Sequence, residues 1–215
     1  WQLTALLPYH DHERERTTGN EQLRGLGDLT VLALYTVYQT HRDSTVYTHK
    51  LQLGGGIKAP TGKYSLSNNA GSVNPSFQLG TGSWDYLLAA EYVVKRNRVG
   101  VNTLLNYTIK TSNGKDYRFG NQTNYGAGIF YLFEWGKLKI LPQAGVSGEI
   151  YESNYQHGQV VHDTSGDVLF GKYGLEAGFG KFSMGVNLMQ PIAQNLTGGN
   201  VEARYRWGIN LNYSL

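Results

Sequence analysis

The last fifteen residues of the chain alternate strictly between two kinds of side chain. Every second position is apolar or aromatic: Val201, Ala203, Tyr205, Trp207, Ile209, Leu211, Tyr213 and Leu215. The positions between them are polar or glycine. Because successive side chains of a β-strand point to opposite faces, this stretch predicts one strand with an apolar face and a polar face. Strands of soluble sandwiches have about five or six residues. The greater length therefore favours a strand that crosses a membrane, with lipid on one side and a lumen on the other.

The same alternation recurs along the rest of the chain, and it predicts ten strands in a single domain, 1–215. We expect them at residues 1–9, 27–40, 45–59, 77–95, 99–110, 125–135, 138–150, 169–179, 182–188 and 201–215. No run approaches the ~20 consecutive apolar residues that a membrane helix requires. The abrupt start of the first strand suggests that upstream chain is missing, in which case the complete barrel would have twelve strands.

The connections between these strands differ in length in a regular order. Residues 10–24 are too polar to span anything and are expected to form an exposed loop. Further long loops are expected at 60–76, 153–166 and 191–200, an intermediate one at 111–116, and short turns at 41–44, 96–98, 136–137 and 180–181. Outer-membrane barrels join their strands by short periplasmic turns and longer extracellular loops. The predicted fold class is therefore all-β: a transmembrane antiparallel up-and-down β-barrel in a bacterial outer membrane, with both chain ends in the periplasm.

Composition agrees with this prediction and excludes several other classes. Charged residues make up 16% of the chain, whereas soluble domains average roughly 25%. There is no cysteine, so neither a disulfide framework nor a thiolate metal site can form. The net charge is only +3 and the basic residues are scattered, which gives no support to nucleic-acid binding.

Three segments near the N-terminus resemble a known family. They read GLGDLTVLAL at 25–34, LGGGIKAPTGKYS at 53–65 and QLGTGSWDYLLAA at 78–90. Their order and spacing are similar to those of the outer-membrane β-barrel family named "MetA-pathway of phenol degradation". The resemblance is specific over residues 25–92 and only architectural afterwards. It implies an outer-membrane channel whose cargo is a hydrophobic or aromatic small molecule, and it brings no catalytic residue.

Charged side chains at inward positions are the main candidate site. Both signs occur, on nearly every predicted strand, and these residues are expected to line the lumen: Lys50, Lys58, Asp85, Glu91, Lys110, Glu134, Lys139, Glu149, Lys172, Glu176, Glu202, Arg204 and Arg206. One interpretation is a salt-bridged plug, since buried charges need partners. The other is a polar path for a solute. A barrel of ten or twelve strands lies between those that side chains fill and those that leave a wide channel, so both stay open.

Other chemistry has weaker support. Residues 56–63 look like a phosphate loop, but the motif would require glycine in place of Ile57 and serine or threonine in place of Tyr64, and no helix is expected to follow. His10 and His12 could share a metal in an extended segment, although a solvated loop is the favoured explanation. The polar loop around His157 and Asp163 could suggest a hydrolase at the rim, but one loop carries no base and orienting-group geometry. We therefore predict no catalytic residue, no metal and no cofactor.

Passive transport of small, hydrophobic or aromatic solutes is the leading function. The alternative is a structural or accessory barrel that scaffolds a membrane protein complex, and an outer-membrane enzyme is third. The expected partners are the lipid bilayer and lipopolysaccharide, a small-molecule solute, and protein partners if the chain belongs to a complex.

Overall fold

The computed structural model describes residues 1–16, 19–40, 46–65, 75 and 78–213. Apart from one 3₁₀ turn, η1 (Thr197–Gly199), the regular elements of this part of the chain are β-strands. No helix among these residues is long and apolar enough to cross a membrane. The main strands are β1 (Gln2–Leu6), β4 (Leu29–Gln39), β5 (Thr48–Ala59), β6 (Asp85–Arg96), β7 (Val99–Ile109), β9 (Gln122–Tyr131), β11 (Leu138–Tyr151), β14 (Gly166–Phe179), β15 (Phe182–Leu196) and β16 (Arg206–Tyr213).

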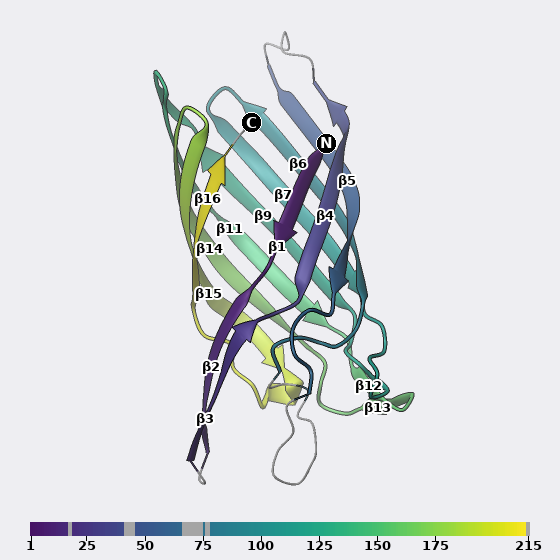
Figure 1. The fold of residues 1–215 in the computed structure, drawn as a ribbon. Coiled ribbons are helices and arrows are strands. Elements are labelled where there is room, and N and C mark those ends of the chain that lie inside the picture. Colours follow the sequence, from purple (N-terminus) through teal and green to yellow (C-terminus); the bar gives the residue numbers. More distant parts are fainter. Residues whose placement is uncertain (17–18, 41–45, 66–74, 76–77, 214–215) are drawn as a thin grey trace.

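These ten strands form one antiparallel sheet in the order β1-β4-β5-β6-β7-β9-β11-β14-β15-β16, with the short β10 (Phe133–Trp135) also paired to β11. The ten predicted strands of the main sheet all exist, and each pairs with its neighbour along the chain. The ninth is longer than predicted, because β15 continues to Leu196 through most of the loop expected at 191–200. The sheet is strongly curled, as Figure 1 shows. β1 and β16 are its two edges, and no ladder joins them among the described residues.

Long and short connections lie at opposite ends of this sheet (Figure 1). At one end, tight turns join β6 to β7 and β14 to β15. At the other end lie two small accessory sheets: the hairpin of β2 (Tyr9–Arg16) and β3 (Gly19–Leu26), and the trio β8 (Tyr117–Arg118), β12 (Asn154–Gln156) and β13 (Gln159–Val161). The predicted turn at 41–44 and most of the predicted loop at 60–76 fall outside the described residues. We call the two ends the turn end and the loop end.

Two predicted boundaries near the N-terminus were wrong. Of the residues 10–24, expected to be a loop, those that the structure describes belong to the strands β2 and β3, which pair from Tyr9 opposite Leu26 to Arg16 opposite Gly19. A ladder uses only backbone groups, so a polar sequence can form one. The strand expected to begin at residue 77 begins instead at Asp85. The stretch before it bonds elsewhere, because the amides of Leu79 and Gly80 donate to the carbonyl of Lys63.

The closing strand is shorter than its fifteen-residue alternation predicts. β16 covers Arg206–Tyr213, and its pairing with β15 stops at Arg206 opposite Met189. Gln190 follows Met189 on β15, and after it comes Pro191, which has no amide hydrogen to continue the ladder. Ala203 is held by a side chain instead: its amide donates to Oε1 of Gln194 (2.6 Å), and its carbonyl accepts from Nε2 (3.3 Å).

One face of the sheet exposes large apolar side chains along its whole width. Residues of this kind occur on every main strand after β1, and each is more than one third exposed: Tyr35, Leu53, Leu88, Leu105, Ile129, Val146, Leu175, Val186 and Ile209. Their neighbours in sequence point to the other face. The predicted alternation is therefore present in the structure, with the apolar set on the side that packs against nothing else in the chain.

The opposite face is the concave one. Nη1 of Arg206 on β16 lies 2.6 Å from Oε1 of Glu149 on β11. Three strand spacings, about 14 Å along a flat sheet, separate these strands. The two side chains can meet only on the inside of the curl. Few side chains are completely buried there, and the largest are Phe170, Leu34, Val168 and Asp85.

Candidate functional site

A cluster of four charged residues lies on the concave face at the loop end. Nζ of Lys58 contacts Oδ2 of Asp85 at 2.5 Å and Oδ2 of Asp28 at 3.2 Å. Nζ of Lys110 lies 3.2 Å from the same Asp85 oxygen. The Asp85 side chain is completely buried, and the lysine side chains are 12% and 13% exposed. Two lysines thus face two aspartates, so the cluster is balanced in charge.

The cluster joins the three motif segments of the N-terminal half. Asp28, from the first motif, accepts hydrogen bonds from the amide of Gly62 (3.0 Å) in the second and from the amide of Thr81 (2.8 Å) in the third. The Thr61 hydroxyl also joins the second motif to the first, because it accepts a hydrogen bond from the amide of Leu29 (2.8 Å) and donates one to the carbonyl of Gly27 (2.9 Å). These bonds fix segments that are far apart in sequence, and they explain why the motifs carry these residue types.

Glycine is required where two of these segments touch. A Cβ on Gly62 would lie 2.8 Å from the carbonyl oxygen of Leu79, and one on Gly80 would lie 2.3 Å from a carboxylate oxygen of Asp28. Either methyl group would push the segments apart. The glycines of the motifs therefore allow the close approach on which the Asp28 hydrogen bonds depend.

An aromatic group covers the cluster on its loop side. The ring of Phe119 makes edge contacts with Tyr64 and Tyr117, at centroid distances of 6.2 and 5.0 Å. Asn113 links this group to the third motif, because its Nδ2 donates to the carbonyl of Thr81 (2.9 Å). Burial raises the pKa of the Tyr64 and Tyr117 phenols above the ordinary value, so both stay neutral hydrogen-bonding groups.

A second ion pair ties the C-terminal edge to the middle of the sheet. Arg206 on β16 binds Glu149 on β11, and its guanidinium lies over the ring of Phe170 at 4.6 Å. The Tyr151 hydroxyl donates to the other oxygen of the Glu149 carboxylate. The pair therefore draws the edge strand inward over the buried Phe170 side chain, and it contributes to the curl of the sheet.

Between these two clusters the ladder aligns residues in rows across five strands. One row runs Val93, Asn102, Gly128, Gly145 and Lys172, and the adjacent row runs Glu91, Leu104, Gly126, Ser147 and Phe170. On the central strands β9 and β11 these rows contain three glycines, Gly126, Gly128 and Gly145, and the small residue Ser147. Because the glycines carry no side chains, the middle of the concave face is hollow.

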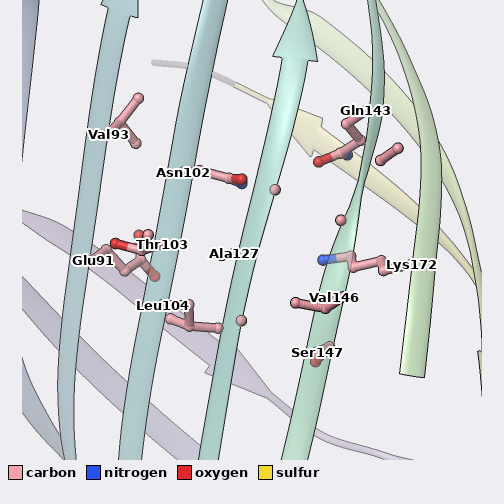
Figure 2. A pocket seen from close by; sticks show the side chains of 14 residues that line it. Glu91, Val93, Asn102, Thr103, Leu104, Ala127, Gln143, Val146, Ser147 and Lys172 are labelled. Atoms are coloured by element: carbon pink, nitrogen blue, oxygen red, sulfur yellow. The ribbon is translucent and has the colours of Figure 1, made fainter. Parts of the chain in front are cut away.

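A cavity of about 200 Å³ occupies this hollow. Its walls are polar and apolar together, with Asn102 and Gln143 beside Val93 and Leu104. Figure 2 shows the Glu91 carboxylate on one side and the Lys172 ammonium on the other. Chemically, the cavity offers a negative group, a positive group, two amides and a small apolar surface.

The structure places the predicted lumen-lining residues in several different surroundings. Lys58, Asp85 and Lys110 meet in the loop-end cluster, and Glu149 meets Arg206. Lys139 pairs with Glu134 at 3.5 Å near the turn end, and both are exposed. Glu91 and Lys172 line the cavity, and Glu176 lines a second hollow with Lys139. Lys50 lies opposite Gln39 on β4, while Glu202 and Arg204 lie outside the strands. Whether any of them faces water in a lumen stays a prediction.

Several residues of these clusters were not predicted from the sequence. Asp28 is absent from the predicted set of inward charged residues, although its place in the GLGD motif was a usable signal. Asn102, Gln143 and Tyr151 carry no charge, so a set of inward charged residues does not include them. Among the described residues, no group of three His, Asp or Glu side chains could hold a metal ion.

Comparison with known proteins gives one finding about the family. A family model described as "Putative MetA-pathway of phenol degradation" matches residues 2–171 of this chain. The match covers most of the chain, including all three motif segments. No curated protein matches the sequence.

Proposed function

Because this chain belongs to the MetA-pathway of phenol degradation family, we propose that it is an outer-membrane channel for passive uptake of small solutes, hydrophobic or aromatic ones among them. One observation carries the proposal. The same strands expose apolar side chains on the convex face and hold polar, charged and glycine residues on the concave face. The family description supplies the class of solute.

Lipid is the medium that suits the convex face. Monomeric soluble proteins rarely expose contiguous apolar patches larger than a few hundred Å², whereas here the apolar side chains continue from β4 to β16. Aromatic side chains such as Trp135 and Trp207 are 58% and 67% exposed. Their amphipathic rings suit the membrane interfaces. In the proposal, lipopolysaccharide surrounds the loop end.

The proposed lipid surroundings also require the sheet to close. An unpaired strand edge cannot face hydrocarbon, since each unsatisfied backbone group there costs several kcal/mol. With ten strands in antiparallel order, β1 and β16 run in opposite directions, which is the geometry that an antiparallel closing ladder needs. The proposal therefore includes pairing of the two edges in the membrane, either directly or through further strands.

The polar path runs along the concave face. Ion pairs occupy the loop end and the C-terminal edge, but the three glycines on β9 and β11 leave a cavity of about 200 Å³ between them. A complete salt-bridged plug would fill this space. The proposed transport is passive and requires no catalytic step.

A conductance experiment tests the proposal with a matched pair of variants. The purified chain is inserted into planar bilayers and compared with Leu104→Trp and Leu105→Trp. Leu104 lines the cavity, whereas Leu105 lies on the convex face and is 52% exposed. We expect wild type and Leu105→Trp to conduct equally and Leu104→Trp to conduct less.

Two results would contradict the proposal. One is a correctly inserted wild-type chain that passes neither ions nor small solutes, which would favour the scaffold alternative, especially if the chain co-purified in a stoichiometric complex. The other is equal conductance of the two tryptophan variants, because transport would then follow another route.

A further inference from the structure

The charges on the concave face differ in whether they have partners. Three acidic residues are paired with basic ones: Asp85 with Lys58 at the loop end, Glu149 with Arg206 at the C-terminal edge, and Glu134 with Lys139 at the turn end. Glu91 and Lys172 line the central cavity, and neither makes an ion pair within the part of the chain that the structure describes. Both side chains are partly exposed. Their charges therefore act on the cavity and not on a partner.

The register of the sheet keeps these two charges apart. Glu91 is on β6 and Lys172 is on β14, with β7, β9 and β11 between them. Four strand spacings correspond to about 19 Å along the sheet. The curl shortens the direct path, but in the two rows that hold Glu91 and Lys172 the strands between them carry no charged side chain. The carboxylate and the ammonium thus stand on facing walls of the same cavity (Figure 2).

We propose that Glu91 and Lys172 form a transverse charge pair that binds and orients solutes carrying both a positive and a negative end. This inference rests on the proposed channel function and deepens it. A solute with two opposite charges or a large dipole can satisfy both walls at once, aided by the Asn102 and Gln143 amides. A singly charged ion is attracted by one wall and repelled by the other, so the wild-type cavity discriminates little between cations and anions.

Reversal potentials in a gradient of KCl test the charge pair. Glu91→Gln removes the negative wall and should make the channel prefer Cl⁻, whereas Lys172→Gln should make it prefer K⁺. A unit charge about 7 Å from a passing ion, even in bulk water, changes the permeability of that ion by about threefold. Because the charge acts in opposite directions on K⁺ and Cl⁻, the permeability ratio should change by about sevenfold. The double variant loses both charges and should return close to wild type.

Two conservative variants at the turn end serve as matched controls. Glu134→Gln and Lys139→Gln remove the same charges from an exposed ion pair outside the cavity. They should shift the reversal potential much less than their counterparts in the cavity. Equal shifts from both sets would show that overall lumen charge and not the cavity pair sets the selectivity, and would overturn the inference.

Uptake by proteoliposomes tests the class of solute. The probes are β-alanine, a zwitterion, and glycerol, which is neutral, and swelling rates are compared as a ratio. We expect the double variant Glu91→Gln/Lys172→Gln to lower the ratio of β-alanine to glycerol uptake. An unchanged ratio would overturn the inference while leaving the channel intact. A wild-type chain that passes neither probe nor ions would instead overturn the channel function itself.

Discussion

Asp85 is the residue on which the loop-end cluster depends most, and its replacement by asparagine has a calculable consequence. The wild-type cluster contains two carboxylates and two ammonium groups, with Asp85 in contact with both lysines. Asp85→Asn keeps the shape and a hydrogen bond from Ser83 (3.0 Å in the wild type) but leaves one positive charge in excess in a buried place. Breaking a buried ion pair by removing one partner costs about 3–5 kcal/mol. Because the amide preserves part of the bonding, we expect a loss of about 3 kcal/mol.

A second substitution separates charge balance from shape. In the double variant Asp85→Asn/Lys110→Met, one carboxylate and one ammonium group remain, those of Asp28 and Lys58, which are 3.2 Å apart in the wild type. Restored neutrality should recover about 1–2 kcal/mol, a coupling typical of residues within one network. The exposed Glu134–Lys139 pair provides the control, since Glu134→Gln at a surface pair should cost less than about 1 kcal/mol.

Urea unfolding from lipid vesicles, followed by tryptophan fluorescence, measures all four free energies. Trp84 directly precedes Asp85, so it reports on this region. A loss below about 1 kcal/mol for Asp85→Asn would refute the reasoning, because buried charge imbalance would then carry no cost. A double variant that is no more stable than Asp85→Asn would equally refute the argument from neutrality.

Two further predictions concern the membrane. Ile209→Arg should destabilise the folded chain in vesicles by roughly 2–4 kcal/mol, the cost of arginine at a lipid-facing midplane position. Asn210→Arg, on the concave face, should cost much less. If folding-yield assays by gel mobility showed equal tolerance of the two variants, the convex face would not contact lipid. Cysteine at Gln159 should react with an impermeant reagent on intact cells, whereas cysteine at Lys137 should react only after the outer membrane is opened; the reverse result would invert the orientation.

Much of the architecture could be read directly from the sequence. Alternation with period two depends on each strand alone, because the pleat sends neighbouring residues to opposite faces regardless of what surrounds them. The positions of Leu105 and Ile209 on the apolar face, and the ten strands of the main sheet, were therefore predictable. Short turns such as that at Gly180, with φ of 62°, were likewise signalled locally.

The polar hairpin and the end of the last strand could not be read in the same way. Whether residues 10–24 form strands depends on a backbone partner, and the polar alternation does not reveal it. The end of β16 depends on Pro191 in the neighbouring strand, since a ladder needs donors on both sides. Alternation in residues 201–205 continued past the point at which pairing was available.

The sequence by itself determined which residues face inward, and only the tertiary structure decided what they do there. Asp28, Asp85 and Lys110 belong to separate segments, and their meeting requires the register of four strands and the close approach at Gly80. Glu91 and Lys172 share the same face and the same alternation, yet the sheet keeps them unpaired across a cavity. Period two is a local property of one strand, whereas the distance between two charges is set by strand order, register and curl.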